Sequence, residues 1–328
     1  FYQGPPVLLG FAVAYTALLR RNLRREEPAR VRCGGVPAVL ANACAALLIL
    51  VYVYAFHLEP RMLRVRRHRI VSEKLSGLER PVRLVVISDI QTDDVGAYEE
   101  KVLKTAASLE PDIVVMLGDY IQTRSLRRMT DEMGELWGLI LKHGLRGRFG
   151  SFAVNGNVDP MEWCGWLFDE TSYRCGQNAP WPIELPGETV LLTGLSYEAS
   201  RAGGWRAGAL DLARFTQNAR RDGRPLFHMV IGHCPDYVLN GVVREQSDLC
   251  LAGHTHGGQV QLPVIGPLFT LTRAPRQIAG GGMHEWRGTT VCVSRGIGME
   301  RGMAPRLRFL CPPEIVVIEL MPPSKKNE

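Results

Sequence analysis

The chain has 328 residues, of which 46% are hydrophobic and 22% are charged, a composition typical of a globular protein with one or two domains. Its net charge of +6 comes from the N-terminal end, because residues 1–70 contain eleven arginines, no lysine and three glutamates, whereas the remainder contains 28 basic and 30 acidic residues. A basic segment beside apolar runs is typical of a membrane surface and argues against nucleic-acid binding.

The N-terminal region predicts a membrane anchor. Residues 36–58 form an apolar run of 23 residues without Asp, Glu, Lys or Arg, long enough to cross a bilayer core of about 30 Å. Arginine-rich flanks favour a transmembrane helix over a buried core helix. The shorter apolar run 5–19 is either a first span or an interfacial helix. We therefore expect one or two transmembrane helices with an Arg-rich loop in residues 1–60, and a basic linker over 61–80.

Residues 81–328 are expected to form a globular domain. Eight short apolar runs are typical of buried strands: 81–89, 111–119, 150–157, 189–196, 226–233, 248–254, 289–294 and 314–320. Helices are expected at 97–109, 125–143 and 207–221. The strand–helix–strand order at the start implies a right-handed βαβ unit. So many strands predict an α/β fold in which two sheets face each other and helices flank them.

Five of these strands end in side chains that can bind metals: Asp89, Asp119, Asn155 to Asn157, His233, and His254 with His256. A lone Asp or His at a strand end is more often structural. Five such ends favour a site, because the carboxyl ends of α/β strands converge on one crevice. Carboxylate, amide and imidazole donors suit Mn, Fe and Zn, and a pair of such ions can clamp an in-line displacement at phosphorus. None of the eight cysteines forms a CxxC pair, so a zinc knuckle is not expected.

The ordered motifs VISDIQ, PDIVVMLGDY, VNGNVD, IGHCPD and LAGHTHGGQ resemble those of the calcineurin-like metallophosphoesterases, which are D-x-H, G-D, G-N-H-D/E, G-H and G-H-x-H. The segment VSRGIGMERGMAPRLRFLCPPEIVVIEL resembles a bacterial membrane-associated branch that includes UDP-2,3-diacylglucosamine pyrophosphatases. The resemblance covers about residues 58–320. It implies the metallophosphoesterase sandwich fold and two divalent metal ions, with Mn expected and Zn or Fe as alternatives.

The resemblance also implies the ligands: Asp89 and His256 for the first metal, Asp119 between the two, and Asn157, His233 and His254 for the second. Asp119 and Asn157 are expected to act in catalysis as well.

Two positions depart from the family pattern. Gln91 replaces the histidine of D-x-H, and its amide oxygen is a poorer ligand, so a weaker first site is expected. Asp93 or Asp94 could compensate, although turn or cap roles are the preferred interpretation. Val158 replaces the histidine that stabilises the transition state or protonates the leaving oxygen. Loss of a general acid typically costs a factor of about 10²–10⁴ and less with a good leaving group, so pyrophosphates or activated esters are expected to be favoured over alkyl monoesters.

Arginines near the C-terminus are candidates for phosphate binding. Arg295 and Arg301 are expected to bind substrate, and Arg306 and Arg308 are further candidates. For each of them a surface role is the alternative.

Three further features have two interpretations. His228 lies in an apolar strand and is expected to be a core residue rather than a ligand. His284 either replaces the missing acid or is an ordinary loop residue. The aromatic insert 160–186 is either a lid over an apolar substrate tail or a small satellite core.

The sequence predicts a membrane-anchored dimetal phosphoesterase in the bacterial inner membrane, with a cytoplasmic catalytic domain. Its expected partners are the lipid bilayer and an amphiphilic or nucleotide-linked phosphate substrate, without nucleic acid; the oligomeric state is left open. The favoured reaction converts UDP-2,3-diacylglucosamine to the lipid monophosphate and UMP in lipid A synthesis. The alternatives are a phosphodiesterase with another substrate and a non-catalytic metal-binding scaffold.

Overall fold

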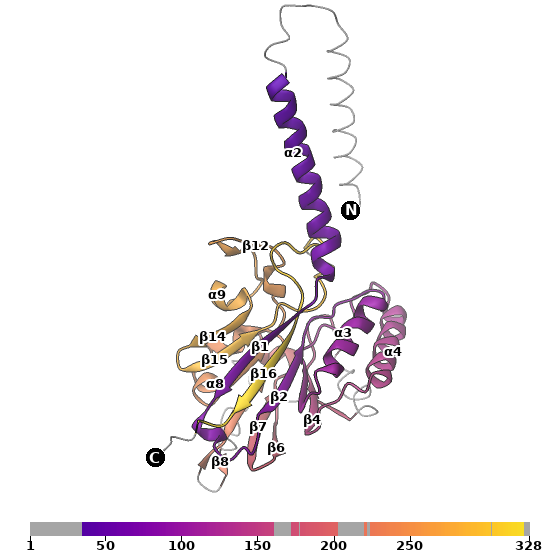
Figure 1. Cartoon of the computed structure of the whole chain (residues 1–328). Coiled ribbons are helices and arrows are strands. Elements are labelled where there is room, and N and C mark those ends of the chain that lie inside the picture. The colour runs from indigo at the N-terminus through magenta and orange to yellow at the C-terminus, as the bar shows by residue number, and fades with distance from the viewer. Residues whose placement is uncertain are drawn as a thin grey trace, which may run out of the picture. The chain divides into compact units, whose positions relative to one another are not determined.

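The computed structural model describes residues 35–160, 172–176, 178–202, 220–221, 224–302 and 304–324. The chain divides into two units, Phe1–Leu58 and Glu59–Glu328, whose elements are labelled in Figure 1.

The first unit contains helix α2 (Gly35–Val53), which continues as a short π-helical turn, η2 (Tyr54–Leu58). The described residues contain one helix that is long and apolar enough to cross a membrane, Val39–Arg61, with a mean hydropathy of 2.2. It overlaps the expected span at 36–58, shifted by three residues toward the C-terminus. The apolar run at 5–19 lies outside the described residues.

The second unit is built on two six-stranded sheets, and several of their strands are labelled in Figure 1. The first sheet has the order β1 (Arg64–Val71), β16 (Glu314–Met321), β2 (Val82–Ile87), β3 (Ile113–Met116), β4 (Gly150–Ala153) and β5 (Tyr173–Cys175). The second sheet has the order β14 (Gly282–Trp286), β15 (Thr289–Val293), β11 (Leu249–Ala252), β10 (Phe227–Ile231), β7 (Glu188–Gly194) and β6 (Pro180–Leu185). All eight strands expected from the sequence are present, so the predicted two-sheet α/β fold is confirmed.

Shorter elements connect and flank these sheets: η3 (Glu59–Arg61), η4 (Glu73–Leu75), α3 (Ala97–Ser108), α4 (Leu126–Lys142), α6 (Tyr197–Ser200), β8 (Arg220–Arg221), β9 (Arg224–Pro225), η6 (Pro235–Leu239), α8 (Gly241–Glu245), η7 (His256–Gly258), β12 (Gln261–Leu262), β13 (Gly266–Pro267) and α9 (Arg276–Ala279).

The main hydrophobic core lies between the two sheets. Alternate residues of β2, such as Leu84 and Val86, pack there with Met229 of β10 and Leu251 of β11. The opposite face of the first sheet, including Val85, packs against helices α3 and α4. Because both faces of these strands are buried, their sequences are nearly continuous apolar runs.

Helix α4 shows how the helices are specified. Its buried residues Met133, Leu136, Trp137 and Ile140 follow the spacing of one helical face. The Ser125 side chain accepts a hydrogen bond from the Arg128 amide at 3.4 Å and caps the helix N-terminus. Helices α3 and α4 fall within one residue of the ranges expected at 97–109 and 125–143.

Parallel pairing places the functional loops at one edge of each sheet. Strands β2, β3 and β4 run parallel to one another, and so do β7, β10, β11 and β15. Their carboxyl ends therefore emerge together, as the sequence predicts for an α/β crevice.

The structure differs from the expected basic linker at 61–80. Residues Arg64–Val71 form strand β1, which pairs in parallel with β16 along its whole length. Arg69 forms an ion pair with Glu319 at 3.1 Å. The strand lies at the sheet edge and is mostly exposed, so it tolerates charged residues. Because of these residues its sequence lacks the apolar pattern by which the other strands were recognised.

Two other expectations concern segments that the structure describes only in part. The helix expected at 207–221 lies mostly outside the described residues, and its last two residues, Arg220 and Arg221, form β8. In the insert 160–186, residues 161–171 are likewise not described. Its described end forms β5 and β6, and Trp181 packs on Phe152 with ring centroids 5.6 Å apart, so this end belongs to the core. Cys175 of β5 is disulfide-bonded, which the sequence analysis did not anticipate.

Candidate metal centre

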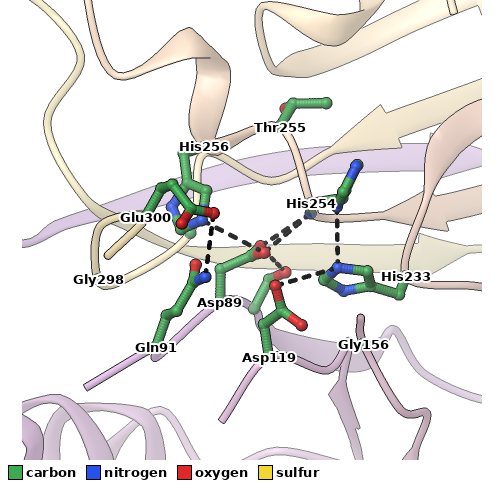
Figure 2. Close-up of polar contacts among 12 residues, drawn as sticks. Asp89, Gln91, Asp119, Gly156, His233, His254, Thr255, His256, Gly298 and Glu300 are labelled. Carbon is green, nitrogen blue, oxygen red and sulfur yellow. Dashed lines mark hydrogen bonds and ion pairs between the residues drawn. The ribbon is translucent and has the colours of Figure 1, made fainter. Parts of the chain in front are cut away.

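Four predicted ligands converge where β3, β4, β10 and β11 end, as Figure 2 shows for three of them. The ligand atoms of Asp119, His233 and His254 all lie within 4.8 Å of one another. His233 Nε2 is 3.1 Å from His254 Nδ1, 3.1 Å from Asn157 Oδ1 and 3.3 Å from Asp119 Oδ2. Two imidazoles, a carboxylate and an amide oxygen therefore surround one point, a donor set suited to a borderline divalent ion.

The orientation of His233 is fixed by the main chain. Its Nδ1 donates a hydrogen bond to the Leu117 carbonyl at 2.7 Å. This assignment directs Nε2 toward the cluster, in the way that metal-binding histidines are held by a partner behind the ring.

Asp89 and His256, the predicted ligands of the first metal, lie adjacent and form the first group of ligands. Asp89 Oδ1 is 3.8 Å from His256 Nε2, and the Asp89 carboxylate accepts hydrogen bonds from the His254 amide at 2.9 and 3.1 Å. The buried atoms Nδ1 and Nε2 of His256 and Oε1 of Gln91 find no hydrogen-bond partner among the described residues. Buried polar atoms are rarely left without a partner, so these residues fit a site that an ion completes.

The loops that carry these ligands are tightly packed. A Cβ at Gly156 would lie 2.0 Å from Asp119 Oδ1, and one at Gly253 would lie 1.9 Å from Ser88 Oγ. Asp89, Asp119 and the two histidines of the last loop, His254 and His256, all adopt positive φ. Such φ values are uncommon for residues other than glycine and concentrate at functional sites.

Asp159 holds two of these loops together, a role that the sequence analysis did not assign. Its carboxylate accepts hydrogen bonds from the amides of Asp119 at 2.7 Å, Tyr120 at 2.9 Å and Gly156 at 2.7 Å. In the family pattern this Asp follows the histidine that Val158 replaces. Here it fixes the backbone that presents Asp119 and Asn157.

Burial and neighbouring charges shift the pKa values of the ligand side chains. Burial raises the pKa of Asp89 to about 7. Burial also acts to raise the pKa of Asp119, but the adjacent His233 outweighs it and lowers that pKa. Burial acts to lower the pKa of His233, whereas the Asp119 carboxylate raises it to about 9. Burial lowers the pKa of His254 to about 4 and that of His256 to about 3, so both rings are neutral and able to bind a metal at pH 7.

The C-terminal arginines are engaged with protein groups. Arg295 forms an ion pair with Glu314 at 2.9 Å, and Arg301 forms one with Asp93. Arg306 also binds Asp93, at 2.9 Å. These pairs compensate the charges that were expected to bind substrate phosphate, and the Asp93 carboxylate is engaged with Arg301 and Arg306.

Arg308 is also structural. It is fully buried and donates hydrogen bonds to several main-chain carbonyls, including those of Gly298 and Cys311. Its guanidinium therefore holds the loop after β15 and does not reach a substrate.

The remaining histidine and carboxylate candidates contact other protein groups. His228 is buried, with Nε2 2.8 Å from Thr193 Oγ1 and Nδ1 2.8 Å from the Gln246 carbonyl, so it is a satisfied core residue as predicted. His284 Nε2 lies 3.2 Å from the Gly281 carbonyl on β14. Asp94 forms a long ion pair with Arg128 at the surface, at 3.6 Å.

A cavity of about 390 Å³ opens beside His254. Among its lining residues are Tyr197, Arg201, Asp236, His254, Leu271 and Arg273. The larger cavity, of about 900 Å³, is lined by residues of the 73–76 and 184–189 segments and by none of the metal-ligand candidates. Of these two cavities, the smaller one borders a metal-ligand candidate, His254.

Comparisons with known proteins identify the family. Residues 82–258 match the calcineurin-like phosphoesterase family. The chain is 29% identical over 278 residues to the uncharacterized metallophosphoesterase YkuE of Bacillus subtilis, covering 82% of this chain and 89% of YkuE. It is 35% identical over 336 residues to the UDP-2,3-diacylglucosamine pyrophosphatase LpxG of Chlamydia trachomatis, covering 88% of this chain and 98% of LpxG.

A third relative is the transmembrane protein with metallophosphoesterase domain of Danio rerio, 26% identical over 201 residues, covering 57% of this chain and 42% of that protein. The family implies divalent metal ions, for which the ligand groups described above are suited. The chain belongs to the calcineurin-like phosphoesterase family and is a metal-dependent phosphoester hydrolase.

Proposed function

We propose that the chain is a membrane-anchored dimetal enzyme that hydrolyses a phosphoanhydride or phosphodiester. The best candidate reaction converts UDP-2,3-diacylglucosamine to the lipid monophosphate and UMP. The observation that carries the reaction class is the convergence of Asp119, His233 and His254 within 4.8 Å, with Asp89 and His256 beside them.

The chemistry divides between the ions and the chain. When bound, two divalent ions supply Lewis-acid stabilisation of phosphoryl charge and activate water at neutral pH; Mn is the expected metal. The chain positions its donors through the Leu117 carbonyl behind His233 and through Asp159 behind Asp119. The Val158 side chain offers no proton to a leaving oxygen. A phosphate leaving group needs little protonation, so this site favours a phosphoanhydride over an alkyl ester.

The cavity beside His254 supports a substrate with more than one phosphate or a nucleotide. Arg201 and Arg273 lie at its wall, and a guanidinium matches phosphate oxygens in a bidentate manner. Tyr197, whose ring is 6.5 Å from that of His254, offers an aromatic face in the same cavity. These groups can hold the part of the substrate that lies beyond the scissile phosphate.

An exposed apolar hairpin supports a lipid-linked substrate. Five large hydrophobic side chains are exposed around β12 and β13: Val264, Ile265, Leu268, Phe269 and Leu271. Leu271 also lines the cavity. Gln261 at the hairpin base donates a hydrogen bond to the Gly257 carbonyl at 3.0 Å, so the hairpin is tied to the metal loop. Contiguous exposed apolar surface commonly marks a ligand or membrane contact.

The membrane location rests on several observations. The helix Val39–Arg61 is long and apolar enough to span a bilayer, and a relative is named as a transmembrane protein. Inner-membrane anchoring with a cytoplasmic domain suits a UDP-linked substrate. The disulfide at Cys175 favours an oxidising compartment instead. Fusions of a periplasmic and a cytoplasmic reporter to the C-terminus decide between the two faces.

The reaction is tested with the purified full-length chain in detergent, loaded with Mn²⁺. We expect UMP release from UDP-2,3-diacylglucosamine, and much slower phosphate release from glycerol phosphate. Asp119→Asn should abolish both, whereas the surface variant Asp94→Asn should retain them. Hydrolysis of bis-p-nitrophenyl phosphate without UMP release would show a phosphodiesterase with another substrate. Inactivity on all substrates with metal bound would favour the scaffold.

A substitution at Val158 tests the preference for a good leaving group. Val158→His reintroduces the family's proton donor beside Asp119. We expect the rate on an alkyl monoester to rise at least about tenfold, from the factor of about 10²–10⁴ that a general acid contributes, with little change on the anhydride. An equal effect on both substrates would contradict the argument.

The hairpin is tested by replacing Val264 and Phe269 with serine. The double variant should lose activity on diacylated substrate in mixed micelles but keep its rate on bis-p-nitrophenyl phosphate. Leu141→Ser, at an equally apolar exposed site on α4, is the matched control. Equal rates of the double variant and wild type on the lipid substrate would exclude a lipid role for the hairpin.

A further inference from the structure

The residue at position 91 is held with its amide nitrogen, not its oxygen, toward the neighbouring polar groups. The Arg301 amide donates to Gln122 Oε1 at 2.9 Å, which fixes the orientation of the Gln122 side chain. Gln91 Nε2 then donates to the same Gln122 oxygen at 3.0 Å and to Glu300 Oε2 at 3.4 Å. This orientation commits the amide nitrogen to protein groups and leaves Gln91 Oε1 buried without a partner among the described residues. Such a neutral amide oxygen is a weaker ligand than the imidazole of D-x-H.

Glu300 lies between the two loops that carry the first group of ligands. On one side, the loop after β15 binds the loop after β2, because the Gly298 amide donates to the Asp89 carbonyl at 2.7 Å. On the other side, the Glu300 amide donates to Gln259 Oε1 at 2.7 Å, and the Gln259 amide binds the His256 carbonyl at 3.0 Å. Figure 2 shows the Glu300 carboxylate beside Gln91, on the His256 side of Asp89.

The donor set of the first group is incomplete without this carboxylate. His256 has two buried ring nitrogens without a hydrogen-bond partner among the described residues, and Asp89 supplies one carboxylate. A neutral glutamine in place of the family's imidazole leaves the site short of one donor. A carboxylate is a good ligand for Mn and Fe and adds negative charge that compensates a divalent ion.

We propose that Glu300 is a ligand of the first metal ion and takes the place of the imidazole that position 91 lacks, while Gln91 is a positioning residue that orients the Glu300 carboxylate. The inference rests on the dimetal centre of the proposed function but not on the identity of the substrate. It assigns a metal role to the segment GMERG, which lies outside the five ligand motifs of the family.

The test measures metal binding directly. The full-length chain is stripped with a chelator, titrated with Mn²⁺ by calorimetry, and its bound metal is counted by elemental analysis. Wild type should bind two ions. Glu300→Gln keeps the side-chain shape and one hydrogen-bonding oxygen but removes the charge. It should lower the affinity for one of the two ions by more than the roughly 10–100-fold that is typical of residues behind the ligands. Glu245→Gln, at an exposed carboxylate on α8, should bind as wild type.

A rescue variant separates a ligand from a merely structural residue. Gln91→His in the Glu300→Gln background restores an imidazole to the first site, and should recover two-ion binding. Gln91→Leu alone should lower the affinity for the first ion less than Glu300→Gln does. Thermal unfolding of each metal-free variant checks that the fold is retained, and Glu300→Asp provides a second variant that preserves the charge and should keep two ions.

Several outcomes overturn the proposal. Two-ion binding by Glu300→Gln with wild-type affinity removes Glu300 from the site. A larger loss in Gln91→Leu than in Glu300→Gln makes Gln91 the ligand instead. A wild-type chain that binds only one ion leaves no first site to complete. If wild type binds two ions but releases no UMP, the proposed substrate fails while the assignment of Glu300 stands.

Discussion

Removal of the Asp159 carboxylate is expected to destabilise the fold and the metal centre together. Its two oxygens accept three hydrogen bonds from buried main-chain amides, those of Asp119, Tyr120 and Gly156. In Asp159→Ala all three donors lose their partner, and each such loss costs about 1–3 kcal/mol. We therefore expect the free energy of unfolding to fall by at least about 3 kcal/mol.

Asp159→Asn provides an intermediate case. One amide oxygen can still accept hydrogen bonds, but the NH₂ group then faces a main-chain donor, so a loss of about 1–3 kcal/mol is expected. Asp94→Asn, at an exposed carboxylate, should change stability by no more than about 0.5 kcal/mol. Asp159→Ala should also weaken Mn²⁺ binding by about 10–100-fold, because the residue orients ligands from behind.

The assay is urea unfolding of the metal-free chain in detergent, followed by tryptophan fluorescence at pH 8.5. This pH lies above the value of about 7 to which burial raises the pKa of Asp159, so the carboxylate is ionised. The expected order of destabilisation is Asp159→Ala, then Asp159→Asn, then Asp94→Asn. An Asp159→Ala variant within about 1 kcal/mol of wild type would refute the role of these hydrogen bonds.

Two further predictions concern packing and pH. Gly156→Ala should lower activity by at least about 100-fold and impair Mn²⁺ binding, because its Cβ would lie 2.0 Å from Asp119 Oδ1. Asp119 would have to move to relieve this contact, and a misplacement of about 1 Å can cost about 100-fold. Gly134→Ala, in open space on α4, should retain both in the same assays. Burial lowers the pKa of His228 from 6.5 to about 4, so the unfolded chain takes up a proton first as the pH falls. Stability should therefore drop by about 2 kcal/mol between pH 7.5 and pH 5 on account of His228, and urea unfolding of His228→Gln should show a correspondingly flatter profile; identical profiles would contradict this.

The buried parts of the fold could be predicted from the sequence because burial requires apolar residues in a recognisable pattern. Strands covered on both faces, such as β3 and β10, appear as short apolar runs, and α4 shows a clear helical period. Strand β1 could not be recognised, since an exposed edge strand with the sequence RVRRHRIV has the composition of a basic surface segment. Its pairing with β16, about 250 residues later, depends on tertiary structure.

The same distinction holds at the centre. Asp119, His233 and His254 were predictable because each follows a buried strand in a short motif with glycine. Glu300 was not, because it lies outside the five ligand motifs, and its proximity to Gln91 arises from folding across 209 residues. Asp159 lay within a motif, but its contacts with three main-chain amides could be seen only in the structure.

The arrangement of two metal ions around the six predicted ligands is the central claim, and anomalous X-ray diffraction at the manganese edge from crystals grown with Mn²⁺ tests it most directly. We expect two anomalous peaks, one on each side of Asp119. One peak should contact Asp89 and His256, and the other should contact Asn157, His233 and His254. The absence of manganese from these side chains, or a single ion bound elsewhere on the domain, would contradict the account.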